Sequence, residues 1–89
     1  MTKNNWAWGV PGITFIWHGQ WSDPEVEYKD YIFNYWDIED AICYTAKEEL
    51  GIPDNEDISD DQFDTWIANN VEWIYGYMDD LVWIANGAP

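Results

Sequence analysis

The sequence predicts an α+β fold, a three-stranded antiparallel β-meander followed by two α-helices, the second of them long. Three observations favour this class. The first part of the chain contains short segments rich in β-branched and aromatic residues, which are typical of strands. From Asp37 onwards the apolar residues recur every three or four positions, which is typical of helices. Helix-capping residues also flank the two apolar stretches of the second part.

The strands are expected within residues 13–35, after an irregular arm at residues 1–12 that Trp6 and Trp8 hold against the body. Residues 13–21, 25–28 and 31–35 predict the first, second and third strand. Lys29 and Asp30 are left to form a two-residue turn between the last two strands. The whole chain of 89 residues is predicted to be a single domain, because it is too short for two cores.

The first helix is predicted at residues 37–50. Asp37 is a suitable N-cap, and Gly51 stands just past the last apolar position. The residues at helical spacing predict the side that faces the core: Ile38, Ala41, Ile42, Thr45, Ala46 and Leu50.

The second helix is predicted at residues 59–86, where Ser59 and Gln62 form a capping box at its start. The apolar pattern continues without a shift from Phe63 to Ala85, so one long helix is possible. Asn69-Asn70 and Gly76 are weak points where it could bend or split, because Asn and Gly are poor helix formers. One long helix and two helices broken near Asn69-Asn70 therefore both stay open.

The charge of the chain is strongly negative and lies mainly in its second half. The formal net charge is −15, and residues 48–89 contribute −11 because they hold eleven acids and no Lys or Arg. Such a charge argues against direct binding of nucleic acid or an anionic membrane surface, since like charges repel. It predicts a basic protein as the partner.

The acids of this segment are the candidate partner-binding residues: Asp54, Glu56, Asp57, Asp60, Asp61, Asp64, Glu72, Asp79 and Asp80. On one continuous helix, about 100° of turn per residue places five of them on one side: Asp57, Asp61, Asp64, Glu72 and Asp79. Acids three or four residues apart, such as Asp57, Asp61 and Asp64, lie about 5–6 Å from each other, a spacing similar in scale to that of phosphates along a nucleic-acid strand. The pattern predicts a surface that imitates a phosphate backbone.

The acids allow two other interpretations. Charged helix faces usually serve only solubility, but they normally include Lys or Arg four residues from an acid, and this segment has none. Asp57, Ser59 and Asp61 alternate like the first ligands of a calcium loop. Gln62 and Ala68 then occupy the positions that need Gly and Glu, so no metal site is predicted.

Three aromatic residues form a second stripe on the predicted long helix: Trp66, Trp73 and Tyr77. Additional core against the N-terminal arm is the favoured interpretation, and contact with a subunit or partner is the alternative, because aromatic residues are enriched at interfaces. His18 and Cys43 are each solitary, so they predict neither a zinc site nor a catalytic pair. We therefore expect no enzymatic activity and no cofactor.

The sequence contains no apolar run long enough for a signal peptide or a membrane span, which predicts a cytoplasmic protein without a membrane partner. Its single cysteine agrees with a reducing compartment. A monomer and a homodimer both stay open.

In its small size, its acidity and its helical rows of acids such as Asp57, Asp61 and Asp64, the chain resembles phage-encoded anti-restriction and anti-CRISPR inhibitors that mimic DNA. The resemblance is in kind, covers mainly residues 54–80 and assigns no specific family. It implies a stoichiometric inhibitor in the basic groove of a nucleic-acid-binding enzyme, acting in the host cytoplasm if phage-encoded. An immunity protein or antitoxin against a cationic toxin is one alternative, and a structural domain that is acidic only for solubility is another.

Overall fold

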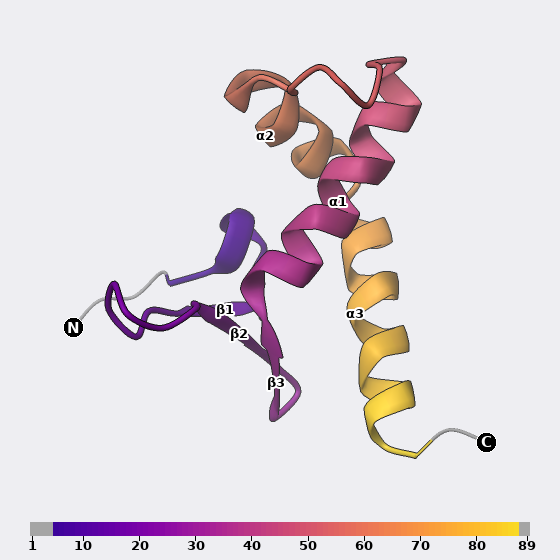
Figure 1. The fold of residues 1–89 in the computed structure, drawn as a ribbon. Helices are drawn as coiled ribbons and strands as arrows, with labels where there is room; N and C mark the ends of the chain where they lie inside the picture. Colours follow the sequence, from indigo (N-terminus) through magenta and orange to yellow (C-terminus); the bar gives the residue numbers. More distant parts are fainter. Residues whose placement is uncertain (1–4, 88–89) are drawn as a thin grey trace.

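The computed structural model describes residues 5–87 and contains one antiparallel sheet, in the order β1-β2-β3, followed by helices (Figure 1). This arrangement confirms the predicted α+β class. The elements are η1 (Ala7–Gly9, a short 3-10 turn), β1 (Thr14–Ile16), β2 (Glu25–Tyr28), β3 (Tyr31–Asn34), α1 (Tyr35–Leu50), α2 (Asp60–Asn69) and α3 (Val71–Ala85).

The turn between β2 and β3 has the predicted two residues, since Tyr28 pairs with Tyr31. Lys29 and Asp30 both adopt positive φ, 52° and 70°, the combination that matches the twist of a tight hairpin. The predicted first strand is too long, because β1 ends at Ile16, the residue that pairs with the first residue of β2. Residues 17–21 have no strand opposite them and belong to the β1–β2 loop.

The N-terminal arm is irregular, as predicted, and its described part is held against the body. Its backbone pairs with the segment around β1, where the N–H of Ala7 donates to the carbonyl of Ile13 (2.7 Å). The ring of Trp8 stacks on Tyr35, with centroids 5.1 Å apart. Residues 1–4 of the predicted arm lie outside the described residues.

The first helix starts earlier than predicted. Asn34, not Asp37, is the N-cap of α1, and its side-chain oxygen accepts a hydrogen bond from the N–H of Asp37 (3.2 Å). Asn34 is also the last residue of β3, so the chain passes from strand to helix without a loop. Gly51 ends the helix at φ 74°, as its position predicted.

Of the two alternatives left open for residues 59–86, the structure has two helices, broken at Asn70, and Gly76 lies inside α3. Ser59 and Gln62 form the predicted capping box at the start of α2. Asn70 then leaves the helical conformation (φ −133°, ψ 35°), and its side-chain amide donates to the carbonyl of Trp66 (2.8 Å) at the end of α2. As a result α3 runs in a different direction from α2 (Figure 1).

The core lies between the sheet, α1 and α3. Its completely buried side chains include Val26 of β2, Ile38 and Ile42 of α1, and Ile74 and Met78 of α3. Two residues of the predicted core-facing stripes, Leu50 and Ala85, are exposed at helix ends. The radius of gyration is 13.7 Å, against about 12 Å for a compact chain of this length. This open arrangement leaves several large rings at the surface.

Candidate functional site

All nine candidate acids are exposed, but they belong to three different segments. The loop between α1 and α2 carries Asp54, Glu56 and Asp57, α2 carries Asp60, Asp61 and Asp64, and α3 carries Glu72, Asp79 and Asp80. The prediction of one straight row is therefore wrong. Asp57 precedes the N-cap of α2, and α3 turns away from α2 at Asn70 (Figure 1).

The three acids of α2 differ in what they contribute to the helix. Asp60 and Asp61 lie in its first turn, where the positive end of the helix dipole stabilises a carboxylate. Asp64 lies one turn further on, four residues from Asp60 and three from Asp61, where it meets two like charges at about 5–6 Å. Of these three acids, Asp64 therefore contributes least to the stability of the fold.

Asp79 differs from the other candidate acids, because its carboxylate is paired with other side chains of the chain. Its Oδ1 accepts hydrogen bonds from the hydroxyl of Tyr28 (2.7 Å) and from the Nζ of Lys29 (2.9 Å). The hydrogen bond from Lys29, followed by that from Tyr28, lowers the pKa of Asp79 below its ordinary value. These contacts connect α3 to the β2–β3 turn, so Asp79 has a structural role.

Two acids of α1 join the site although the sequence did not single them out. Glu39 and Asp40 face the start of α2 across a hollow of about 180 Å³, which is lined by Glu39, Asp40, Cys43, Ile58, Asp60 and Phe63. Asp40 and Asp54 also line a neighbouring hollow, of about 380 Å³. A helical wheel of residues 35–50 would have placed Asp40 opposite the buried Ile38 and Ile42. The approach of α1 to α2 depends on tertiary packing and has no local signal.

We use the name acidic surface for the following acids of α1, the connecting loop and α2: Glu39, Asp40, Asp54, Glu56, Asp57, Asp60, Asp61 and Asp64. Glu39 is half-buried and accepts a hydrogen bond from the hydroxyl of Tyr35 (3.2 Å). Burial, followed by the charge of Glu39, raises the pKa of Tyr35 to about 12, so this hydroxyl remains a donor at neutral pH.

Basic side chains compensate few of the carboxylates. Within residues 5–87, Asp79 faces Lys29 and Glu25 faces the ring of His18 (2.7 Å), which leaves sixteen of the eighteen acids without a basic side chain in contact. Lys47 lies beside the acidic surface, but its Nζ donates to the backbone carbonyl of Asp54 (3.0 Å). The negative charge of the acidic surface is therefore almost unopposed within the described chain.

The three candidate aromatic residues are mainly part of the core, but Trp66 is hydrogen-bonded to α1 and not to the N-terminal arm that the prediction named. Trp66 is only 4% exposed, and its Nε1 donates to Glu49 (2.9 Å). Its ring packs edge-on against Trp73, which stacks on Tyr77 with centroids 5.4 Å apart. Trp73 and Tyr77 remain partly exposed.

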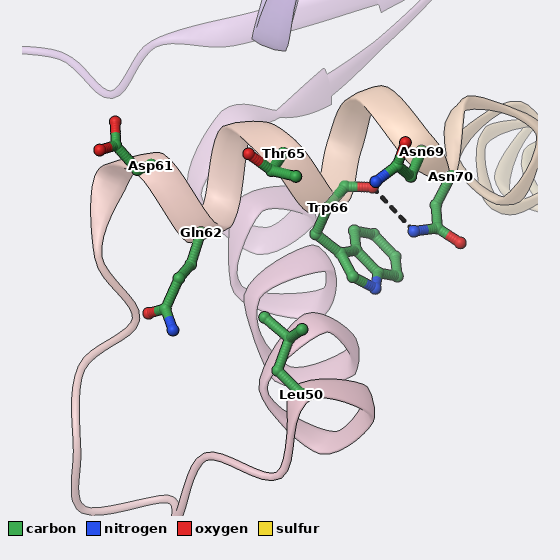
Figure 2. Close-up of a pocket in the computed structure, with 7 residues that line it drawn as sticks. All are labelled: Leu50, Asp61, Gln62, Thr65, Trp66, Asn69 and Asn70. Atoms are coloured by element: carbon green, nitrogen blue, oxygen red, sulfur yellow. Dashed lines mark hydrogen bonds between the residues drawn. The ribbon is translucent and has the colours of Figure 1, made fainter.

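Trp66 also forms one wall of an open hollow of about 290 Å³ between the end of α1 and α2 (Figure 2). The hollow is lined by Leu50, Asp61, Gln62, Thr65, Trp66, Asn69 and Asn70. Figure 2 shows Asp61 directed away from the Trp66 ring, and the amide of Asn70 hydrogen-bonded to the carbonyl of Trp66. Apart from Asp61, the side chains that line this hollow are uncharged.

Among residues 5–87 there is no group of three or more His, Cys, Asp and Glu side chains with the geometry to hold a metal ion. His18 is exposed and contacts Glu25, and Cys43 is half-buried beside the acids of α1. None of the helices in the same range combines the length and the apolar character needed to cross a bilayer.

The chain was compared with protein-family models, with curated proteins and with solved structures, and none of the three comparisons gave a match.

Proposed function

We propose that this protein is an acidic inhibitor that mimics nucleic acid and binds the basic groove of a nucleic-acid-binding protein. It acts by stoichiometric binding and not by catalysis. The carboxylates of the acidic surface take the place of phosphates, and Lys and Arg side chains of the target bind them as they would bind nucleic acid. The target class is the one that the resemblance implies, a restriction or RNA-guided enzyme of the host.

The observation that carries this proposal is the lack of basic side chains paired with the carboxylates of the acidic surface. Glu39, Asp40 and Asp60 line one hollow, and Asp40 and Asp54 line the next. Within the described residues, no basic side chain contacts a carboxylate of the acidic surface. Such a surface repels itself and destabilises the compact state. Solubility alone does not require this arrangement, because mixed charges also keep a small domain soluble.

The spacing of the acids also supports phosphate mimicry. Asp60 and Asp64 are one helical turn apart, which corresponds to about 5–6 Å between side chains. Glu39 and Asp40 supply charge on a second helix across the hollow. The charge is thus spread over two adjacent helices, and a basic groove would meet several carboxylates at once.

The net charge predicts how such a complex forms. A charge of −15 attracts a basic protein over distances of about a Debye length, which is about 8–10 Å at physiological salt. Association is then fast at low ionic strength and slows steeply as salt is added. We place this action in the cytoplasm, where host enzymes encounter nucleic acid.

The test begins with a triple variant, Asp57→Asn, Asp61→Asn and Asp64→Asn, and a control of equal charge change on the sheet, Asp23→Asn, Glu27→Gln and Asp30→Asn. Each protein is immobilised, exposed to a bacterial lysate and eluted with duplex DNA. Captured nucleic-acid-binding enzymes are then purified, and their DNA binding is titrated with the inhibitor by fluorescence anisotropy.

Wild type and the sheet control should block DNA binding at about one inhibitor per target, and the triple variant should have lost most of this inhibition. The association rate should fall as salt rises. The proposal is refuted if DNA does not displace the captured proteins, or if the triple variant inhibits as well as wild type while circular dichroism shows that it is folded.

A further inference from the structure

The outer face of α1 combines exposed aromatic rings with carboxylates. Ile38, Ile42 and Ala46 point into the core, so the opposite face is turned to solvent. On that face Trp36 is 47% exposed and Tyr44 is 56% exposed. The remaining members of the face are Asp37, Asp40, Lys47 and Glu48. Three acids and one base therefore surround two rings that the fold does not cover.

Elsewhere the protein itself shows how such a combination holds a cation. The Nζ of Lys29 lies 5.3 Å from the centroid of the Tyr28 ring and 2.9 Å from Oδ1 of Asp79. The hydroxyl of Tyr28 donates to the same carboxylate oxygen (2.7 Å). The hydrogen bond to Asp79 raises the pKa of Lys29, which means that this site favours the charged ammonium. A ring and a carboxylate connected by a phenol hydrogen bond thus form a cation site.

Tyr44 and Glu48 repeat the ring, the carboxylate and the phenol hydrogen bond of this site, without the cation. Its hydroxyl donates to Oε2 of Glu48 (3.3 Å), one turn further along α1. The charge of Glu48, followed by the hydrogen bond to it and then by the charge of Asp54, raises the pKa of Tyr44. A phenol that donates to a carboxylate has a more electron-rich ring, which strengthens attraction to a cation. The one nearby base among the described residues, Lys47, directs its Nζ to the Asp54 carbonyl instead.

We propose that the outer face of α1 binds arginine side chains of the basic partner, with guanidinium groups stacked on Trp36 and Tyr44 and paired with Asp40 and Glu48. This inference rests on the proposed function, because it assumes a basic protein partner. It specifies which side chains of that partner bind, and it adds the outer face of α1 to the acidic surface as a place of contact. It adds ring stacking to the purely electrostatic attraction of the acidic surface, which it adjoins at Asp40.

Arginine suits this face better than lysine. A guanidinium group is planar and weakly hydrated, so it can stack on an aromatic ring while its N–H groups bind a neighbouring carboxylate. Lysine offers a point charge that is strongly hydrated. A second copy of the chain is disfavoured as the occupant, because it carries the same charge of −15.

The experiment measures the binding of fluorescent oligo-arginine and oligo-lysine peptides of equal length by anisotropy. The variants are Trp36→Ala, Tyr44→Leu and the two combined, and Tyr44→Phe retains the ring without the hydroxyl. Trp21→Ala is the matched control, because it removes an indole that is 89% exposed and that belongs to the β1–β2 loop and not to α1. Circular dichroism checks folding, and sedimentation reports the oligomeric state.

Wild type should bind both peptides and prefer oligo-arginine. Each lost ring should weaken oligo-arginine binding about two- to fivefold, with a smaller effect on oligo-lysine, so that the preference decreases. Tyr44→Phe should retain part of the preference, and Trp21→Ala should change neither affinity.

If the folded double variant has an unchanged preference, the ring proposal is overturned, whereas the proposed function still stands through salt-sensitive binding of both peptides. If wild type binds neither peptide, both proposals fail. A changed oligomeric state of the double variant with unaltered peptide binding would assign this face to a second copy of the chain, and would also overturn the proposal.

Discussion

Replacing Asp64 by lysine should make the protein more stable and weaken its binding to a basic partner. Asp64 lies four residues from Asp60 and three from Asp61, and each like-charge pair on a helix costs about 0.2–0.5 kcal/mol. A lysine at this position would turn both repulsive pairs into attractive ones of similar size. By the same pair energies, the free energy of unfolding should rise by about 1–2 kcal/mol at low salt.

The assay is thermal unfolding followed by circular dichroism, at low and high ionic strength. A gain of about 1 kcal/mol corresponds to an increase of about 4–8 °C in Tm for a domain of this size. The increase should shrink in about 1 M salt, where the Debye length is only about 3 Å. Asp64→Asn should show roughly half the gain, because it removes the repulsion without adding attraction. A lower Tm for the folded Asp64→Lys variant at low salt, or unchanged binding to the partner, would refute this reasoning.

Three further predictions concern the contacts that hold the site. Trp66→Ala should cost about 3–5 kcal/mol in urea unfolding, because Trp66 is buried; unchanged stability with lost binding would instead make Trp66 a partner contact. Asp79→Asn should lower Tm at neutral pH. The folded pKa of Asp79 lies below its ordinary value of 3.8, so its contribution is present above that value, and the difference from wild type should vanish as pH falls through the folded pKa. Gly51→Ala should lower the free energy of unfolding by about 1 kcal/mol, because alanine is strained at a φ of 74° although its Cβ would meet no other atom within 4 Å. Thermal unfolding measures this, and an unchanged Tm would contradict it.

Local signals predicted several helix boundaries correctly. Ser59 and Gln62 start α2, and Gly51 ends α1, because capping depends on residues within one turn. The same reasoning failed for Asp37, because Asn34 is an equally good cap three residues earlier and ends β3. Two adequate caps at neighbouring positions leave the choice to the strand that precedes them.

The arrangement of the site could not be predicted from the sequence, because it depends on contacts between residues that are far apart along the chain. Asp79 meets Lys29 across 50 residues, and no local pattern indicates that pairing. The apolar periodicity from Phe63 to Ala85 runs through Asn70 without a shift, so it could not decide between one helix and the two that the structure has. The break changes which acids are neighbours, since Asp60 lies near Glu39 and Asp40 and not in line with the acids of α3.

The acids of this chain separate into two groups, those that make a favourable interaction within the described structure and those that make none. Asp60 and Asp61 interact favourably with a helix end, and Asp79 is paired with Lys29. Asp40 and Asp64 are exposed, and no hydrogen bond or ion pair to a described residue compensates either carboxylate. Acids kept only for solubility would be interchangeable between these groups, because solubility depends on net charge. A binding surface requires acids at particular positions even where they do not stabilise the fold. Replacing Asp40 or Asp64 should therefore weaken binding more than the change in total charge alone would.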